Sequence, residues 1–183
     1  PGLQYGDIAF EQLKNDYALR SKINDTKYIL PASALIHLKY KNIDVIVMSM
    51  PLAKMNFREW LGHRTDKEWS ATVMAGWRNK TIQLYGQTVA AVKVMHDAGM
   101  IHFDIKPENI LIFEESGINI IKLSDFGLSQ DRNGSKYKTQ NFGTPAYMAP
   151  ERFDGRPKDI GKITDVYSLG CLLFEIIDGD LPF

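Results

Sequence analysis

The stretch from residue 81 to residue 123 constrains the fold most, because three different sequence patterns follow one another without a break. Apolar side chains at spacings of three and four predict a helix with Thr81 as its N-cap and Gly99 as its C-cap. Two short apolar runs, 110–113 and 118–123, then predict a β-hairpin. A polar loop is therefore expected between the end of a long helix and the first strand of a hairpin.

The rest of the 183-residue chain reads as a mixture of short strands and helices, without an internal repeat or a low-complexity tract. The elements expected are a helix over 8–23, strands over 34–40 and 44–50, short helices and a loop over 56–79, a loop-like segment over 124–159 and a helix over 165–178. Thr164 is the candidate cap of the last helix. Because that helix is apolar nearly all round, we expect it to be buried on every side.

Four segments stand in a fixed order along the second half of the chain. They are His102-Phe103-Asp104-Ile105-Lys106-Pro107-Glu108-Asn109, Asp125-Phe126-Gly127, the run Gly143-Thr144-Pro145-Ala146-Tyr147-Met148-Ala149-Pro150-Glu151, and Asp165-Val166-Tyr167-Ser168-Leu169-Gly170. With the helix and hairpin between them, they resemble the eukaryotic protein kinases. The resemblance covers about residues 8–183 and is strongest from residue 82 onward.

The resemblance implies an α+β, protein-kinase-like fold. We expect residues 1–50 to be a remnant of a small β-rich lobe, 51–53 to be the hinge, and 54–183 to be a mostly helical lobe that lacks its last helices. The absence of an initiator Met and the abrupt end at Phe183 lead us to expect a catalytic-domain fragment.

The same resemblance implies a catalytic set built for phosphoryl transfer, in which a protein mainly positions groups and neutralises charge. Asp104 would orient the attacking hydroxyl and accept its proton, and Lys106 would neutralise the transferring phosphate. Asn109 and Asp125 would hold Mg²⁺, which prefers hard oxygen ligands and takes only one or two carboxylates. Thr144 would contact both Asp104 and Lys106.

ATP would bind where the second predicted strand ends. We expect Met50 as the gatekeeper, Pro51 and Ala53 as the adenine-binding hinge, and Leu111 as the floor under the adenine, in a register that could shift by two residues. Pro51 has no N–H, so only its carbonyl could bond adenine.

Two positions favour serine and threonine over tyrosine as the acceptor. Tyrosine kinases usually carry Ala or Arg where this chain has Lys106, and a Pro-containing run ending in Trp where it has residues 143–147. We therefore expect an intracellular Ser/Thr protein kinase, cytoplasmic or nuclear, that uses ATP and Mg²⁺. The single cysteine, Cys171, fits a reducing compartment.

The expected partners are ATP and a protein substrate that carries Ser or Thr. Lys and Arg number 22, as do Asp and Glu, so no gross charge attracts nucleic acid or an anionic membrane. The sequence leaves the oligomeric state open.

Several departures from the family pattern bear on activity. Phe103 stands where most kinases carry Arg, so we expect activity not to depend on phosphorylation of Ser135, Tyr137 or Thr139. No Gly-x-Gly-x-x-Gly loop and no strand with a phosphate-binding Lys is present, so we expect the chain by itself to be inactive. The helix carboxylate that should pair with that Lys is Asp16 or Glu11, unless both are solvated surface charges.

Two other functions compete with an active Ser/Thr kinase. A pseudokinase or scaffold would bind partners without chemistry, although the intact Asp104, Lys106, Asn109 and Asp125 argue against this. A small-molecule phosphotransferase could share the Asp and Asn residues, but it would not be expected to carry the segments 143–151 and 165–170.

Overall fold

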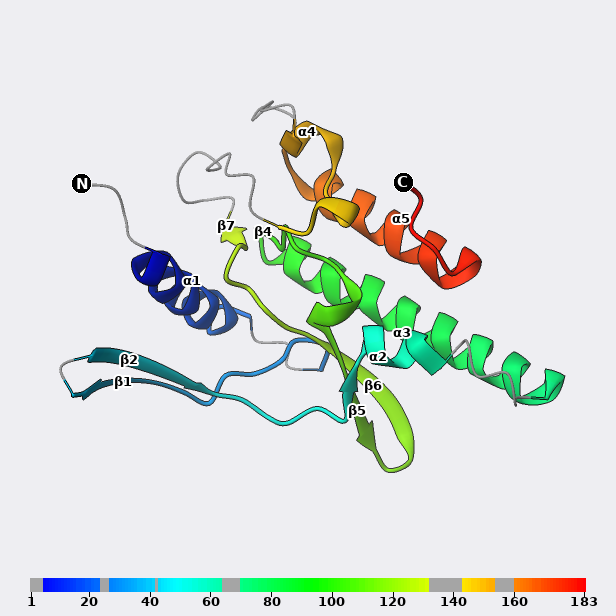
Figure 1. The fold of residues 1–183 in the computed structure, drawn as a ribbon, viewed down its shortest axis with the longest axis horizontal. Helices are drawn as coiled ribbons and strands as arrows, with labels where there is room; N and C mark the ends of the chain where they lie inside the picture. The colour runs from blue at the N-terminus through cyan, green and yellow to red at the C-terminus, as the bar shows by residue number, and fades with distance from the viewer. Residues whose placement is uncertain (1–4, 24–26, 42, 64–69, 132–142, 154–159) are drawn as a thin grey trace.

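The computed structural model describes residues 5–23, 27–41, 43–63, 70–131, 143–153 and 160–183 (Figure 1). Its helices are α1 (Tyr5–Arg20), α2 (Phe57–Gly62), α3 (Ala71–Asp97), α4 (Pro150–Phe153) and α5 (Lys162–Asp178), with short 3₁₀ turns η2 (Pro107–Asn109) and η3 (Pro145–Tyr147). Its strands are β1 (Ala34–Tyr40), β2 (Ile43–Ser49), β3 (Met55–Asn56), β4 (Met100–Ile101), β5 (Ile110–Glu115), β6 (Ile118–Leu123) and β7 (Gln130–Asp131). The predicted α+β composition, with a small β-rich part and a larger helical part, is confirmed.

The strands form three small antiparallel sheets. β1 and β2 make a hairpin in which Ala34 pairs with Ser49, and α1 contacts β2 (Figure 1). β5 lies between β3 and β6, and β4 pairs with β7. The predicted hairpin over 110–123 is confirmed, and its turn uses positive φ at Ser116 and Gly117.

The long helix α3 begins ten residues before the predicted cap. Ser70 is the N-cap and accepts the backbone N–H of Val73, whereas Thr81 lies fully buried inside the helix. The Thr81 hydroxyl donates to the carbonyl of Trp77 and accepts from the indole N–H of Trp60, both at 2.8 Å. Threonine is common at caps because it bonds nearby backbone, and here the same capacity is used within the helix.

The end of α3 and the bounds of α1 lie close to the predicted positions. α3 ends at Asp97 with Ala98 as its C-cap, and Gly99, the predicted C-cap, follows one residue later with a φ of +78°. α1 starts and ends three residues earlier than the expected 8–23.

The main core lies between α3, the β5–β6 hairpin and α5. α3 packs against both β6 and α5 (Figure 1). The largest side chains with almost no exposure in this core are Phe57, Leu84, Met95, Met100, Ile105, Ile110, Ile112, Ile121, Leu123 and Phe126. The polar loop after β4 therefore rests on a packed apolar base.

α5 is buried on one face only, so the prediction of burial on every side is wrong. Leu172 is fully buried, whereas Ile163, Val166 and Ile177 are 61%, 50% and 67% exposed. These exposed positions share one side of the helix, and no described element covers that side. The helix also starts at Lys162, with the hydroxyl of Thr164 turned back toward the backbone N–H of residue 161.

None of the helices in the described part of the chain combines the length and the apolar character needed to cross a lipid bilayer. The sole cysteine, Cys171, lies buried in α5, where burial raises the pKa of its thiol. A neutral, buried thiol acts as a small apolar side chain.

Two adjacent isoleucines of α5 test this packing, because Ile176 is 7% exposed and Ile177 is 67% exposed. We expect Ile176→Ala to lower the free energy of unfolding by about 2–5 kcal/mol, as a truncation in a packed core does. The matched Ile177→Ala should change it by less than about 0.5 kcal/mol, since it alters surface. Urea unfolding followed by circular dichroism measures both values, and equal losses would contradict the one-sided burial.

Candidate active site

The polar loop begins where β4 ends and is anchored by a carboxylate of α5. Asp165 is fully buried and accepts the backbone N–H groups of His102 and Phe103, both at 2.9 Å. The Nε2 of His96, on α3, lies 2.8 Å from the same carboxylate. The hydrogen bonds to Asp165 hold Phe103 at a φ of +68°, a conformation that a non-glycine residue keeps only when its neighbours enforce it.

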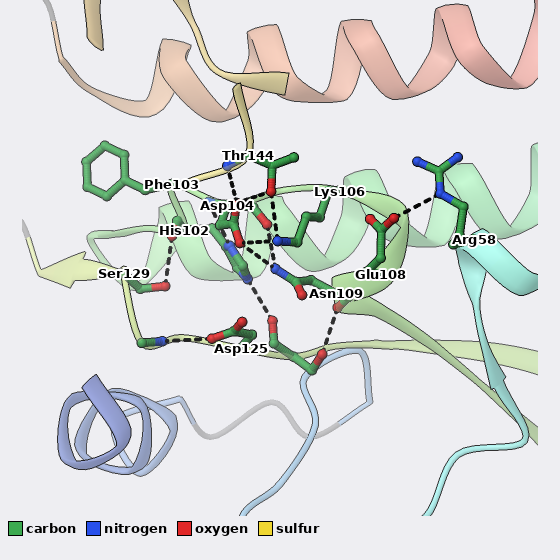
Figure 2. A network of polar contacts seen from close by, with 12 residues as sticks. Arg58, His102, Phe103, Asp104, Lys106, Glu108, Asn109, Asp125, Ser129 and Thr144 are labelled. Atoms are coloured by element: carbon green, nitrogen blue, oxygen red, sulfur yellow. Dashed lines mark hydrogen bonds and ion pairs between the residues drawn. The ribbon is translucent and has the colours of Figure 1, made fainter. Parts of the chain in front are cut away.

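Asp104 stands at the centre of the site and is 7% exposed (Figure 2). Its Oδ2 lies 2.9 Å from the Lys106 Nζ and accepts the Asn109 side-chain N–H at 3.0 Å. Its Oδ1 accepts the backbone N–H of Thr144 at 3.1 Å and the Thr144 hydroxyl at 3.2 Å. Lys106 also donates to that hydroxyl at 2.8 Å. The structure thus brings together four of the predicted catalytic residues, and Thr144 makes both of its predicted contacts.

The Asp104 carboxyl is held in its ionised form. Burial by itself raises the pKa of this group, but the hydrogen bond and charge of Lys106 lower it, with help from His102 and the Thr144 N–H. The net result is a pKa below the ordinary value of an aspartate. Asp104 is therefore a buried anion that accepts hydrogen bonds through both oxygens at neutral pH.

Asp125 is brought to the site through its neighbour Ser124. The Ser124 N–H and hydroxyl both donate to the Asn109 carbonyl at 2.9 Å, and the Ser124 carbonyl lies 3.0 Å from a ring nitrogen of His102. Asp125 follows directly, with an exposed carboxylate and a φ of +60°. One of its oxygens accepts a long 3.4 Å bond from the Gly127 N–H.

Asn109 and Asp125 offer side-chain oxygens of the type that a magnesium ion binds. The Asn109 amide nitrogen is used by Asp104, and its side-chain oxygen accepts no hydrogen bond from the described residues. One neutral oxygen and one carboxylate match what Mg²⁺ takes from a protein when phosphates and water complete its shell. The described residues contain no group of three or more His, Cys, Asp or Glu side chains placed to hold a metal.

The predicted adenine-binding residues lie after β2 and on β5: Met50, Pro51 and Ala53, and Leu111. Met50 is 41% exposed and comes just after the end of β2 at Ser49. The N–H of Lys54 donates to the Ile112 carbonyl at 2.9 Å, so this connection runs beside the strand that carries Leu111. Ala53 therefore lies next to a residue bonded to this strand, and the contact of the four residues with adenine stays a prediction.

Phe103 is held by an arginine from a distant part of the sequence. Arg152 donates to the Phe103 carbonyl at 2.6 Å, and its guanidinium carbon lies 5.0 Å from the centre of the Phe103 ring. Burial lowers the pKa of Arg152, although nearby carboxylates oppose this shift. The expectation that activity does not require phosphorylation concerns Ser135, Tyr137 and Thr139, which lie outside the described residues.

The sequence analysis missed a polar network beside the site. Arg58 of α2 donates to Glu108 at 2.9 Å, to the Tyr147 hydroxyl at 2.6 Å and to Glu175 of α5. Tyr147 donates in turn to Glu175, and burial together with this bond raises the pKa of the phenol. The partners are up to 117 positions apart, so no local pattern could have revealed them.

Asp16 and Glu11, the two carboxylates considered as partners of a lysine, differ in their burial and in their ion pairs. Asp16 is 4% exposed and forms an ion pair with Arg20, which excludes the alternative that it is a solvated surface charge. Glu11 is exposed and lies 3.4 Å from Lys14. Only the opposite charges at positions i and i+4 signalled the Asp16–Arg20 pair in the sequence.

Comparison with known proteins supports one family. A family profile described as "Protein kinase domain" matches residues 40–183. Human mitogen-activated protein kinase kinase kinase 5 is 35% identical over 171 residues, covering 87% of this chain and 12% of that protein. Calcium/calmodulin-dependent protein kinase type 1 of Caenorhabditis briggsae is 40% identical over 100 residues (55% of this chain, 27% of that protein). Serine/threonine-protein kinase ppk34 of Schizosaccharomyces pombe is 42% identical over 100 residues, which cover 54% of this chain and 27% of that protein. The matches therefore span between about an eighth and a quarter of the length of these relatives.

We expect the stability of the fold to depend on pH through the ion pair of Asp104 and Lys106. The pKa of Asp104 is lower in the folded than in the unfolded protein, so its ionised form stabilises the fold. This stabilisation is fully present above the unfolded pKa of about 3.9 and is lost as pH falls through the folded pKa. Lys106→Met removes the cation and leaves the burial, so we expect a loss of about 1–3 kcal/mol at pH 7. The loss should shrink as pH falls towards 3, because without Lys106 burial raises the pKa of Asp104 and the variant takes up a proton more readily than the wild type.

Urea unfolding at both pH values measures this difference. Lys93→Met is the matched control, because the Lys93–Asp97 pair is exposed and should leave stability nearly unchanged at both pH values. An equal loss at pH 7 and pH 3 for Lys106→Met would show that the ion pair is not its cause.

Proposed function

This chain belongs to the eukaryotic-type protein kinase family, and we propose that it carries the catalytic residues of an enzyme that phosphorylates serine and threonine in proteins. The observation that carries the proposal is the arrangement around Asp104. A buried, ionised carboxylate is held between a lysine, an asparagine and a threonine from two separate segments. Such an arrangement suits a reaction in which positioning and charge neutralisation do most of the work.

Asp104 acts as the base in this proposal. Its carboxylate orients the substrate hydroxyl and takes up its proton as the oxygen attacks phosphorus. Its lowered pKa keeps it ionised and able to accept at neutral pH. Lys106, 2.9 Å away, is placed to neutralise the charge of the phosphate that is being transferred.

Thr144 links the catalytic loop to the segment where a protein substrate would lie. Its N–H and hydroxyl both reach Asp104, and its hydroxyl accepts from Lys106. We propose that this contact keeps the two segments in register while the substrate hydroxyl is bound.

Asn109 and Asp125 would hold Mg²⁺, and the nucleotide would be ATP. When bound, the metal offsets the negative charge of the phosphates during transfer. The residues proposed to surround the adenine are Met50, Pro51, Ala53 and Leu111. The register of the hinge could shift by two residues. The small lobe would then comprise residues 1–50, the hinge residues 51–53 and the large lobe residues 54–183.

Serine and threonine specificity is supported by Lys106, by the segment 143–147 and by the names of several relatives. The substrate is proposed to be a protein, and an intracellular location is proposed because the chain has a single, buried cysteine.

The role of Asp104 can be tested with Asp104→Asn in the full-length protein that contains this chain. We expect the rate of phosphate transfer to a generic Ser/Thr substrate to fall by about 10²–10⁴-fold, since the base is lost. ATP binding, measured with a fluorescent analogue, should be retained. The same change at exposed Asp97 serves as the matched control.

The outcome separates the alternatives. Transfer at the wild-type rate by Asp104→Asn would exclude Asp104 as the base. A wild-type protein that binds protein partners but transfers no phosphate would instead favour a scaffold.

We also expect the 183-residue chain by itself to turn over ATP negligibly. Its sequence holds neither a Gly-x-Gly-x-x-Gly loop nor a Val-Ala-x-Lys strand, and in this family both groups contact the phosphates. Phosphorylation of a generic Ser/Thr substrate by this chain, dependent on Mg·ATP and lost in Asp104→Asn, would contradict the expectation.

A further inference from the structure

The peptide group that joins Phe103 to Asp104 is held at both of its polar atoms. Its carbonyl accepts from the guanidinium of Arg152 at 2.6 Å. Its N–H, which belongs to Asp104, donates to the Nδ1 of His102 at 3.2 Å. Because the peptide group is planar, fixing both atoms fixes its rotation, and that rotation sets the direction in which the Asp104 side chain leaves the backbone.

The conformation of Phe103 needs support from both sides. Its φ of +68° is uncommon for a residue with a large side chain, and such a conformation persists where the surroundings enforce it. The N–H of Phe103 donates to Asp165 of α5, and its carbonyl accepts from Arg152 of α4. The residue before Asp104 is thus held by two helices.

Arg152 is itself buried, with 9% of its surface exposed. Its guanidinium carbon lies 5.0 Å from the centre of the Phe103 ring, and cations favour the face of an aromatic ring. Burial disfavours the charge of this side chain, whereas the nearby carboxylates of Asp104, Asp165 and Glu151 favour it. One cationic side chain therefore binds Phe103 twice, at its carbonyl and at its ring.

The backbone that carries Arg152 is anchored to α5. The Thr164 hydroxyl of α5 donates to the Glu151 carboxylate at 2.9 Å. The backbone N–H of Arg152 donates to the Ala149 carbonyl at 3.0 Å. The two groups that hold Phe103 thus have a common base, because Asp165 belongs to the same helix as Thr164.

The segment that carries Thr144 passes close to the bond between Arg152 and Phe103. A Cβ added at Gly143 would lie 3.3 Å from a terminal nitrogen of Arg152 and 3.5 Å from the Phe103 carbonyl oxygen. The next residue, Thr144, donates its N–H to the Asp104 Oδ1 at 3.1 Å. The bond of Arg152 to Phe103 therefore lies beside the contact between Thr144 and Asp104.

The geometry points to Arg152 as a positioning residue that aims the Asp104 carboxylate at Thr144 through the peptide group of Phe103. The consequence for catalysis rests on the proposed function, in which Asp104 is the base. A reacting group displaced by about 1 Å can cost about 100-fold in rate. Arg152 therefore contributes to transfer by keeping the base where Thr144 and the substrate hydroxyl meet it.

The test uses Arg152→Met in the full-length protein, with Arg78→Met as the matched control, since Arg78 is exposed on α3. The first readout is backbone hydrogen exchange at Asp104 and Thr144, with the β5–β6 hairpin as reference. The second is the kcat and the ATP KM for phosphate transfer to a generic Ser/Thr substrate. In Arg152→Met only, we expect faster exchange at both residues but not in the hairpin, and a kcat about 10–100-fold lower at an unchanged ATP KM.

A merely structural role would speed exchange in the hairpin as well and leave the kcat of the folded protein unchanged, and either result would overturn the inference. So would exchange at Asp104 and Thr144 equal to that of Arg78→Met. If the wild type transferred no phosphate but exchange responded as expected, the proposed function would fail and the positioning of Asp104 by Arg152 would stand.

Arg152→Lys is made in parallel, because removing the donor of a buried carbonyl is costly for folding. Lysine keeps a charge and a donor but lacks the planar group that faces the Phe103 ring. We expect the same changes as in Arg152→Met, but smaller. A lysine variant that matched the wild type in exchange and in kcat would overturn the inference.

A double-mutant cycle tests whether Arg152 acts through the contact of Asp104 with Thr144. Thr144→Ala removes the hydroxyl that donates to Asp104. If both residues position the same carboxylate, the combined loss of kcat in Thr144→Ala with Arg152→Lys should be smaller than the product of the single losses. A combined loss equal to that product would show that Arg152 acts independently of this contact and would overturn the inference.

Discussion

The buried carboxylate of Asp165 is the contact on which the site depends. It belongs to the core helix α5, and both of its oxygens accept backbone N–H groups of the loop after β4. A fully buried carboxylate is tolerated only when its hydrogen bonds are satisfied. Two backbone N–H groups and the Nε2 of His96 surround the carboxylate of Asp165. The loop is therefore fastened to the packed core at the residues just before Asp104, so the position of the proposed base is set by core packing.

Phe126 extends this constraint to the other side of the site. The Phe126 ring lies 5.3 Å from the ring of His102, which belongs to the loop after β4. The guanidinium of Arg20 lies over the Phe126 ring. The proposed base and the proposed metal ligand Asp125 thus rest on neighbouring buried groups. α1 bonds the backbone just after Asp125, whereas α5 bonds the backbone just before Asp104.

The residues around Asp104 could be assigned from the sequence because their order and spacing form a dense pattern over 102–109, 125–127 and 143–151. Element boundaries were harder, as the burial of Thr81 within α3 shows. The network of Arg58 and the hold of Asn15 on residues 126–129 join positions separated by up to 117 residues. Such contacts depend on how elements pack, and a single sequence carries no local signal for them.

The sequence by itself determined the fold class, the β5–β6 hairpin, the stop of α3 just before Gly99 and the identity of the catalytic candidates, because each depends on local periodicity, turn chemistry or a short motif. Only the tertiary structure decided that Asp16 is buried with Arg20, and that α5 is buried on one face. The physical reason is the same in both cases. Burial and charge pairing are properties of the surroundings of a side chain, and those surroundings come from segments distant in the chain.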